Sequence, residues 1–404
     1  MSASLRDVAL AVWTEAVAAV HGERVAQAAL RAETFEGPVD LVALGKAALP
    51  MARGAWRVLG TRIRRALVVT GEGYDTEVAL PSARFRVLIG DHPLPGERSL
   101  AAGAALVDFV RAGPPPGGWL LLLSGGASSL VEHPAPGVDL ALLRRANAWL
   151  LASGLSIDRV NAVRRRLSAL KGGGLLRLLA PGPVWAGYLS DIPGDHLPDL
   201  GSGPLFPERP PLPAGLPDWL AAACRWEAPP VPAVPVRHHL LAGLSRALDA
   251  AARAARTRGW PVHRHDAPLR GEAAEVGARL GRWLAREAPP GVHLWGGETT
   301  VTLPPEPGRG GRNQALALAA ALELAGHDGV ALLAGGTDGH DGASDHAGAL
   351  VDGTTLARAR AAGLDARRAL VRADSAPLLA AVGDALPARP TATNVADLLV
   401  AVRR

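Results

Sequence analysis

The stretch WLLLLSGGASSL, residues 119–130, places a fully apolar run directly before a turn of glycines and serines. The run has the length of a strand and is apolar at successive positions, which predicts burial of both its faces. Similar runs recur at 39–44, 66–70, 85–89, 184–189, 292–295 and 330–334. Helical patterns lie between many of them. This alternation indicates an α/β protein whose parallel sheets are covered on both sides.

Most of these runs end in a glycine-rich polar turn. In open α/β sheets, ligands bind beyond the carboxyl ends of the strands. Such turns occur in both halves of the chain, so the sequence predicts one large site built from both. A proline-rich stretch at 204–235 interrupts the pattern, because proline lacks an amide donor and fixes φ. We therefore predict an N-terminal domain at 1–225, a connection at 204–235 and a C-terminal domain at 236–404.

The length of 404 residues suits two domains. The single cysteine, Cys224, excludes an internal disulfide framework and a cysteine-based zinc cluster. The longest apolar runs are too short to cross a bilayer as helices. The N-terminal twenty residues are predicted to form an amphipathic helix rather than a signal peptide, so a cytoplasmic location is expected.

Basic residues give the chain a net charge of +5, and 41 of the 43 are arginine. Lys46 and Lys171 are the two lysines, and a lysine kept in so arginine-rich a chain can mark a place where a compact ammonium is required. The arginines are scattered and no aromatic platform accompanies them. An anionic small substrate is therefore favoured, while a nucleic-acid-binding module stays open on the high isoelectric point alone.

Lys46 follows the apolar run at 39–44 after one residue, Gly45, at the expected start of a helix. A cation is unfavourable beside the positive end of a helix unless an anion binds there too. The turn that holds Ser124, Gly125, Gly126 and Ser128 has the small residues that let backbone amides approach a phosphate. Each feature also has a structural interpretation, as an exposed lysine and as an ordinary turn. Neither a P-loop motif nor a strand followed by G-x-G-x-x-G occurs in the chain.

A helix capped by Asp158 is predicted over 158–174, with Asn161, Arg164, Ser168 and Lys171 along one stripe. These polar groups suit an anionic ligand, a domain contact or simply a solvated face.

Two aspartates, Asp191 and Asp195, follow the run at 184–189 in a Pro-Gly turn. Paired carboxylates there could hold Mg²⁺ or accept a proton from a hydroxyl, or they could only cap the turn.

In the C-terminal half, Glu298 follows an apolar run, and Arg312 and Asn313 precede a strongly apolar helix. An arginine in such a glycine-rich loop matches a transferring phosphoryl group, and Asn313 could cap the helix. Asp338 and Asp341 could order the ATP–Mg²⁺ side or tie the domains together. The last polar motif contains Thr391, Thr393 and Asn394, and it precedes a closing strand or helix.

The ordered series of motifs resembles the glycerate 2-kinase family, which pairs a glycerate-kinase domain with a MOFRL domain. The motifs that carry the resemblance are GKAA, DHPLPGERS, SGGASSL, NAVRRRLSALKGG, SDIPGDHLPDLGSGP, GGETTV, GRGGRNQ, TDGHDG and PTATNVADL. The resemblance implies an α/β fold of two α/β domains. The larger would be a Rossmann-like three-layer sandwich, and the active site would lie in the interdomain cleft. It also implies transfer of the γ-phosphoryl group of ATP to the 2-hydroxyl of D-glycerate, which gives 2-phosphoglycerate.

The resemblance assigns the family's functional lysine to Lys46 and its functional arginine to Arg312. Asp191 completes the expected catalytic set, and Asp191 and Asp195 are the expected metal ligands. The expected substrate- and phosphate-binding residues are Ser124, Gly125, Gly126, Ser128, Asn161, Arg164, Lys171, Asp195, Glu298, Asn313, Asp338 and Asn394. Ala392 departs from the family, which has glycine there. It would fit only if its φ is negative or a close backbone approach is relaxed.

ATP and Mg²⁺ are the expected cofactors, D-glycerate is the expected partner, and neither nucleic acid nor a membrane is expected. An NAD(P)H-dependent hydroxypyruvate reductase is the alternative, although the dinucleotide fingerprint is missing. The sequence leaves the oligomeric state open, with a homodimer as one option.

Overall fold

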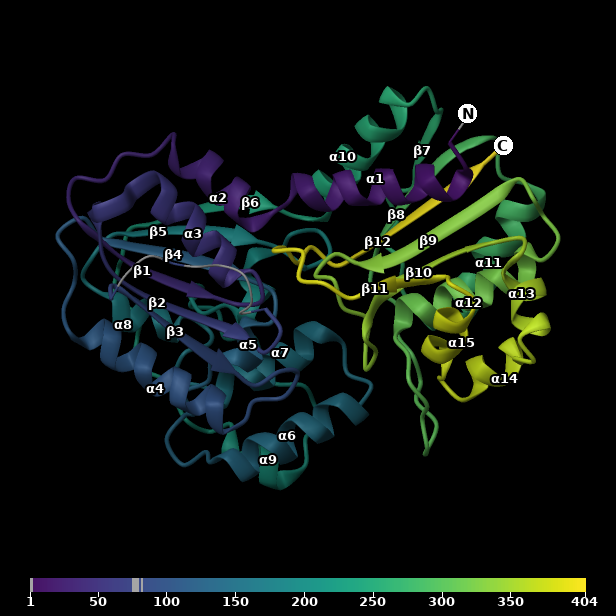
Figure 1. Ribbon diagram of the computed structural model, residues 1–404. Coiled ribbons are helices and arrows are strands. Elements are labelled where there is room, and N and C mark those ends of the chain that lie inside the picture. Colours follow the sequence, from purple (N-terminus) through teal and green to yellow (C-terminus); the bar gives the residue numbers. More distant parts are fainter. Residues whose placement is uncertain (1–2, 75–79, 81–82) are drawn as a thin grey trace. The chain divides into compact units, whose positions relative to one another are not determined.

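The protein is described here by a computed structural model that covers residues 3–74, 80 and 83–404 (Figure 1). It divides into two compact units. The larger unit is Gly22–Ala242, and the smaller unit joins the described residues up to His21 with Gly243–Arg404. None of the described helices is both long enough and apolar enough to span a bilayer.

The larger unit contains a six-stranded sheet whose neighbouring strands are all parallel. Its order is β3-β2-β1-β4-β5-β6. The strands are β1 Val39–Leu44, β2 Ile63–Gly71, β3 Phe85–Gly90, β4 Trp119–Ser124, β5 Val184–Leu189 and β6 Val236–Ala242. This is the strand order of a Rossmann fold. From β1 the chain adds strands first on one side of the sheet and then, starting with β4, on the other, so the switch point lies between β1 and β4. Turns that follow these two strands therefore lie at the switch point where such sheets bind ligands.

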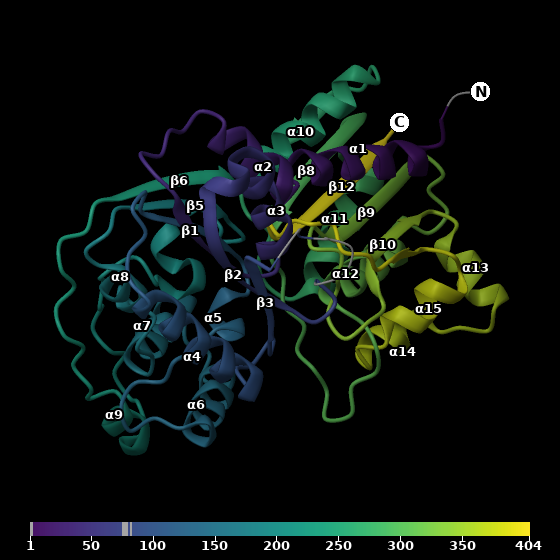
Figure 2. The same cartoon turned by 60° about the vertical axis from the view of Figure 1, so that its left-hand side comes forward.

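Helices cover both faces of this sheet, which confirms the predicted three-layer sandwich (Figures 1 and 2). Helices α4 and α8 share one apolar cluster with β1, β2, β4 and β5, and α3 packs against β1 and β2 with α2 beside it. The helices are α2 Gly22–Leu30, α3 Ala48–Leu59, α4 Glu97–Arg111, α5 Ala127–Leu130, α6 Leu140–Ala152, α7 Ile157–Arg166, α8 Gly174–Leu179 and α9 Asp218–Ala223.

The smaller unit has a mixed sheet of order β11-β10-β9-β12-β8-β7. The strands are β7 Val262–Arg264, β8 Gly291–Gly297, β9 Val330–Gly336, β10 His346–Asp352, β11 Ala385–Pro387 and β12 Asp397–Arg403. Helices α1 and α10 cover one face, and α11, α12 and shorter helices cover the other. They are α1 Leu5–Ala19, α10 Leu244–Thr257, α11 Ala273–Arg286, α12 Arg312–Leu324, α13 Thr355–Ala361, α14 Ala366–Val371 and α15 Ser375–Ala381.

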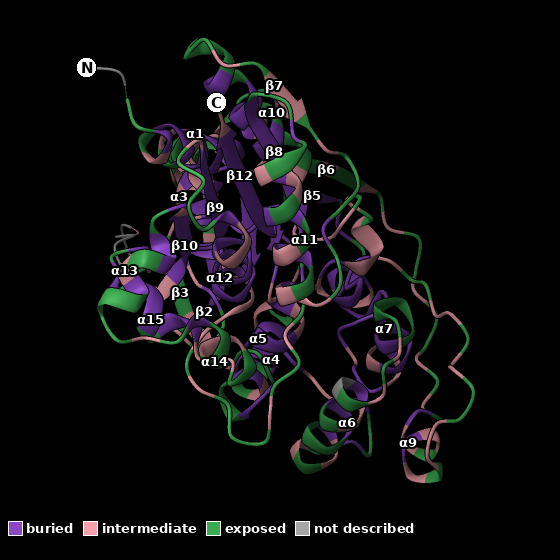
Figure 3. Ribbon diagram, turned by 90° about the vertical axis from the view of Figure 1, so that its right-hand side faces the viewer, coloured by how far each residue is buried: buried purple, intermediate pink, exposed green. Residues whose placement is uncertain are grey.

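All seven strands expected from the sequence are present, but the expectation of parallel pairing is wrong for the smaller unit. Only β7 and β8 pair in parallel there, and the other pairs among the described strands are antiparallel. Strands β8, β9 and β12 are buried almost throughout (Figure 3). A continuous apolar run indicates that a strand is buried on both faces. Strands of any sheet that is covered on both sides have such runs, whether they are parallel or antiparallel.

The division into units differs from the ranges expected from the sequence. Helix α1 belongs to the smaller unit because its apolar face, with Val12 and Trp13, packs in one cluster with β8, β9 and β12. The proline-rich stretch 204–235 lies inside the larger unit, because β6 after it pairs with β5 (Figure 2). The chain therefore leaves the larger unit after β6. The order of residues along the chain does not show that helix α1 belongs to the smaller unit.

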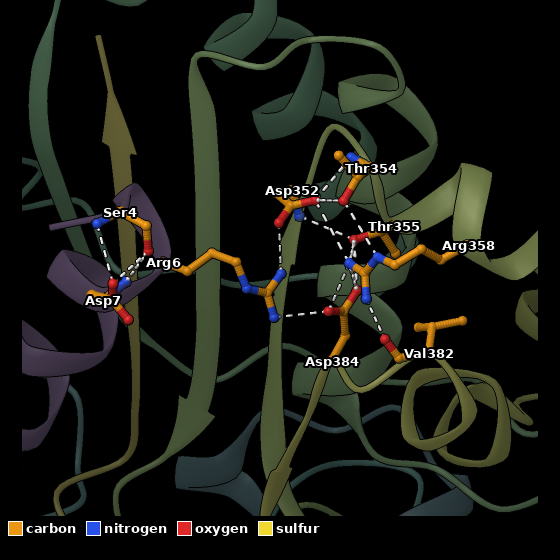
Figure 4. Close-up of polar contacts among 9 residues, drawn as sticks. All are labelled: Ser4, Arg6, Asp7, Asp352, Thr354, Thr355, Arg358, Val382 and Asp384. Atoms are coloured by element: carbon orange, nitrogen blue, oxygen red, sulfur yellow. Dashed lines mark hydrogen bonds and ion pairs between the residues drawn. The ribbon is translucent and has the colours of Figure 1, made fainter. Parts of the chain in front are cut away.

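A polar network fastens α1 to the smaller unit (Figure 4). The Arg6 guanidinium donates to Asp352 at 2.7 Å and to Asp384 at 2.8 Å. The buried Asp384 carboxylate also accepts from Arg358 Nη2, at 2.9 Å, and from Thr355 Oγ1, at 2.6 Å. One carboxylate thus neutralises two guanidinium groups that come from distant parts of the chain.

We expect Asp384→Ala to lower the free energy of unfolding by about 3 kcal/mol, because it removes the buried carboxylate and leaves both guanidinium groups to Asp352 alone. Urea unfolding followed by circular dichroism measures this. The matched control is Asp266→Ala, which removes the exposed partner of Arg264 and should cost less than about 1 kcal/mol. Equal losses of unfolding free energy in the two variants would show that the buried network stabilises the protein no more than an exposed ion pair.

The smaller unit also contains a histidine that resists protonation. His293 on β8 is fully buried and its Nε2 donates to the Pro289 carbonyl at 2.9 Å. The pKa of His293 is lowered to about 4, chiefly by burial. The neighbouring His263, His265 and Arg403 also lower it, and the Pro289 hydrogen bond opposes them.

The unfolded chain therefore binds a proton at this site between about pH 6.5 and pH 4 that the folded chain does not bind. We expect the stabilising contribution to be complete above pH 6.5 and to be lost as the pH falls towards 4, by at most about 3 kcal/mol. Unfolding free energies of the wild type and of His293→Gln, measured at pH 7 and pH 4.5, test this. If the two proteins lose the same stability on acidification, His293 is not responsible.

Candidate active site

At the switch point of the larger unit, hydrogen bonds join the turn after β1 to the turn after β4. After β1, Lys46 N donates to the Gly125 carbonyl at 2.9 Å, and Ala47 N donates to Ser124 Oγ at 3.0 Å. Gly45 has φ +119°, and a Cβ on it would collide with Ser124. Only glycine fits this approach. Ser124 and Gly125 thus join the two turns, which gives them a structural role beside the expected one.

Lys46 lies just before α3, as expected from the sequence. Its side chain passes Gly126, because a Cβ on Gly126 would lie 3.1 Å from Lys46 Cγ. Its Nζ lies 5.5 Å from the centre of the Tyr74 ring. A Cβ on Gly126 would also lie 3.4 Å from His92. Gly126 and His92 line a cavity, and Lys46 lies beside Gly126 without being a lining residue itself.

This cavity, which we call the polar cavity, has a volume of about 220 Å³ and lies entirely within the larger unit. Six of the expected site residues line it: Gly126, Ser128, Asn161, Arg164, Lys171 and Asp191. Loops at the carboxyl ends of β3, β4 and β5 and helix α7 supply its walls. Ser124, Gly125 and Asp195 are not among its lining residues.

The helix expected over 158–174 is shorter than predicted. Helix α7 has Ser156 at its N-cap position and ends at Arg166, so Asp158 is not the cap. Asn161 and Arg164 lie on the helix, whereas Ser168 and Lys171 lie beyond its end. Beyond the helix, Ser168 Oγ accepts from Leu170 N at 3.2 Å, and residue 168 forms a β-bridge with residue 134. A local side-chain bond of this kind competes with helix formation. The polar residues nevertheless gather at one cavity.

Lys171 is neutralised inside the protein. It forms an ion pair with Glu132, which also accepts from Ser168 Oγ at 2.6 Å, and all three side chains are buried. The expected role of Lys171 as a phosphate ligand is therefore unfavourable, because a phosphate would have to displace a buried carboxylate. The sequence analysis missed Glu132. Its signal is a lone acid after the apolar pair Leu130 and Val131.

A chain of hydroxyl groups crosses the polar cavity. Ser202 Oγ donates to Asn161 Oδ1 at 3.0 Å and lies 3.0 Å from Ser128 Oγ. Ser202 has φ +61°, which is unusual for a residue other than glycine. Hydroxyl and amide groups held this way can bind the hydroxyls of a small polyol acid.

Arg164 differs from the other cations of the polar cavity. Its Nε donates to Asn147 Oδ1 at 3.3 Å, and it has no carboxylate ion-pair partner among the described residues. Burial lowers the pKa of Arg164, and the nearby Glu132 opposes that shift. Both oxygens of Glu132 are already bonded to Ser168 and Lys171. A part-buried guanidinium without its own carboxylate is a binding site for a planar anion.

Two of the aspartates after β5, Asp191 and Asp199, line the polar cavity. Asp199 is also held by Arg165 at 3.3 Å and by His196 at 2.8 Å. Asp195 has φ +54°, and its Oδ1 is buried without a hydrogen bond from the described residues. Burial raises the pKa of Asp195, and a Ser190 hydrogen bond partly offsets that shift.

These aspartates do not form a closed metal site, since no group of three His, Cys, Asp or Glu ligands occurs among the described residues. Mg²⁺ commonly binds through one or two carboxylates together with substrate phosphates. Asp191 fits that arrangement by its place on the cavity wall, whereas Asp195 does not line the cavity.

In the smaller unit, Arg312 begins α12 between two carboxylates. Its Nε donates to Asp397 at 2.6 Å, and its Nη2 donates to Glu298 at 2.6 Å. Burial would lower the pKa of Arg312, but Asp397 and Glu298 outweigh it and raise the pKa. Asp397 was missed by the sequence analysis. A charged residue opening an apolar strand is the signal that could have found it.

Asp341 caps helix α12, so the expectation that Asn313 caps it is wrong. The Asp341 carboxylate accepts from Asn313 N at 3.0 Å and from Gln314 N at 2.8 Å, and the N-cap position is Gly311. Burial, together with the nearby Asp397, raises the pKa of Asp341 to about 7 against these hydrogen bonds. Asp341 therefore fixes the backbone from which Arg312 projects.

The remaining expected residues surround the same end of the smaller sheet. Asp338 is buried after β9 and accepts from His340 N at 3.1 Å, and Asn394 is buried before β12. Ala392 has φ +59°, so the condition of a negative φ is not met, and the alanine bears a strain of roughly 1 kcal/mol. Thr337 Oγ1 donates to the Ala396 carbonyl at 2.6 Å and so holds the turn in place.

Comparisons with known proteins agree with this architecture. The family described as a domain of unknown function (DUF4147) matches residues 8–217, and the MOFRL family matches residues 291–397. A crystal structure of a glycerate kinase from Thermotoga maritima has a TM-score of 0.84 and 34% identity over 99% of both chains. The chain is thus an α/β enzyme with a DUF4147 domain and a MOFRL domain.

Two relatives of known name match nearly the whole chain. The D-glycerate 2-kinase of T. maritima is 34% identical over 98% of both chains. A protein of Agrobacterium vitis named "Putative hydroxypyruvate reductase" is 38% identical over 90% of this chain and 98% of its own. The chain belongs to the glycerate 2-kinase family, and it is an enzyme of the kinase class.

Proposed function

We propose that the protein transfers the γ-phosphoryl group of ATP to the 2-hydroxyl of D-glycerate and releases 2-phosphoglycerate and ADP. The observation that carries the proposal is the polar cavity with Arg164, whose guanidinium has no carboxylate of its own among the described residues. The names of the T. maritima relatives support the choice of glycerate.

The acid would bind with its carboxylate on Arg164 and its hydroxyl groups near Ser128, Ser202 and Asn161. Its 2-hydroxyl oxygen would form a bond to the γ-phosphorus while the bond from that phosphorus to the ADP oxygen breaks. Asp191 would accept the hydroxyl proton or hold Mg²⁺, which supplies charge neutralisation when bound with the nucleotide. Because phosphoryl transfer depends on positioning and charge, this small set of residues is sufficient.

Lys46 belongs to the larger unit and Arg312 to the smaller unit. We propose that both neutralise the transferring phosphoryl group. Arg312 would do so with Asp397 still bonded to Nε, since that carboxylate is the more buried of its two partners.

The test is the identity of the product. Purified protein is incubated with ATP, Mg²⁺ and D-glycerate, and the phosphorylated isomer is identified by phosphorus NMR. We expect 2-phosphoglycerate. The 3-phospho isomer would contradict the proposed position, and unchanged ATP would contradict the reaction.

Hydroxypyruvate reduction is the second candidate, because the sheet has the strand order of dinucleotide-binding folds and one relative carries that name. The turn after β1 reads Gly45-Lys46-Ala47-Ala48 instead of the glycine fingerprint that cradles a dinucleotide. Oxidation of NADH by hydroxypyruvate with this protein, with no consumption of ATP, would favour the reductase.

A further inference from the structure

A second cavity, of about 410 Å³, lies in the smaller unit beside Arg312. We call it the apolar cavity because Val301, Leu303, Pro307, Ala315 and Ala343 are among its lining residues. Its chemistry differs from that of the polar cavity, which is smaller and is lined by charged and hydroxyl groups. Cavities with mostly apolar walls and a few polar groups bind flat or bulky ligands.

One wall of the apolar cavity is the turn Gly308–Gly311, which is fixed from behind. Arg309 N donates to Asp374 at 2.8 Å, and Ala376 N donates to the Arg309 carbonyl at 3.0 Å. A Cβ on Gly311 would collide with Asp341, so the turn can pack this closely only with glycine there. The cavity wall is therefore preformed, which lowers the entropic cost of binding.

The two substrates of the proposed reaction differ in the same way as the two cavities. Glycerate is small and polar throughout, whereas a nucleoside triphosphate joins an apolar aromatic base to a chain of anionic phosphates. We propose that the apolar cavity binds the nucleoside of ATP, with the phosphates directed towards Arg312. This inference rests on the proposed function, because it takes ATP to be the phosphoryl donor.

The surroundings of Arg312 permit this arrangement. Of its two carboxylate partners, the Glu298 side chain is 46% exposed, and the Asp397 side chain is only 9% exposed. A phosphate oxygen that binds at Nη2 would displace Glu298, the more exposed of the two carboxylates, while Asp397 keeps the guanidinium in place through Nε. Asp341 holds the first turn of α12, so the position of Arg312 is maintained during the exchange.

Two exposed lining residues allow a test that spares the core. Ala343→Trp fills the cavity from its surface, and Leu303→Ala, at a side chain that is 64% exposed, removes part of its apolar wall. Matched controls are Ala362→Trp and Val371→Ala, which change exposed residues of the same unit that do not line the cavity. Circular dichroism confirms that each variant is folded.

Binding is measured by isothermal titration calorimetry with ADP and, separately, with D-glycerate. We expect the Kd for ADP to rise at least about tenfold in Ala343→Trp and about fivefold in Leu303→Ala, because apolar contact area is blocked or lost. The Kd for D-glycerate and both controls should stay within about twofold of the wild type.

Other outcomes separate the two proposals. If the wild type binds ADP and neither variant weakens it, the apolar cavity does not hold the nucleoside, and the proposed function is unaffected. If the variants weaken D-glycerate binding instead, the cavity belongs to the acid and the inference is wrong. If the wild type itself does not bind ADP, the proposed ATP-dependent reaction fails together with the inference.

Discussion

Replacing Lys46 by alanine is expected to lower kcat about 10³-fold in an assay with ATP and D-glycerate, because loss of a cation that stabilises a transferring phosphoryl group costs that much. Its position supports this expectation: it follows β1 at the switch point of the sheet, and its side chain lies beside Gly126. Lys46→Arg should also be impaired, since a guanidinium fork is wider than an ammonium and Gly126 lies close to the lysine stem.

The matched control for Lys46 is Arg53→Ala on helix α3, which removes a cation paired with Glu23 and outside both cavities. We expect its kcat to stay within about twofold of the wild type, since this half-buried ion pair lines neither cavity. The thermal midpoints of all variants show whether a loss of activity reflects unfolding. Wild-type kcat in both Lys46 variants would remove Lys46 from the mechanism.

Replacing Arg164 by leucine is expected to raise the KM for D-glycerate about 100-fold, with a smaller change in kcat and no change in the KM for ATP. Two charge-assisted hydrogen bonds to a carboxylate supply about 3 kcal/mol, which corresponds to that factor. Arg164→Lys should recover only part of it, because a single ammonium does not reproduce the paired geometry.

Stability gives a second measurement for Arg164. Burial lowers its pKa, which means that the folded protein disfavours this charge. We therefore expect Arg164→Leu to keep or raise the thermal midpoint while binding of the acid is lost. Arg159→Leu on the same helix is the control, because Arg159 is exposed and does not line the polar cavity. A fall in kcat with an unchanged KM for D-glycerate would show that Arg164 acts on the phosphoryl group instead of the carboxylate.

The local pattern of the sequence predicted the strands and the turns that carry the site. Lys46, Gly126 and Asp191 lie where the turns at the ends of strands were expected, because a strand buried on both faces has to be apolar along its whole length. The shortened helix α7 could not be predicted in the same way. It ends where Ala169 N donates to the carbonyl of His133, a partner 36 residues earlier in the chain.

The sequence by itself determined the burial of strands such as β4 and β5 and the polar groups that follow them, because burial and turn formation depend on neighbouring residues. It was wrong about the burial of β3, an edge strand that is mostly exposed or half-buried. Only the tertiary structure decided the strand directions of the smaller sheet and the unit to which α1 belongs. It also decided which cations remain available. Lys171 is neutralised by Glu132, 39 residues away, and Arg312 is held by Asp397, 85 residues away, whereas Arg164 keeps no carboxylate partner among the described residues. Charge compensation depends on distance in space, which the order of residues does not contain.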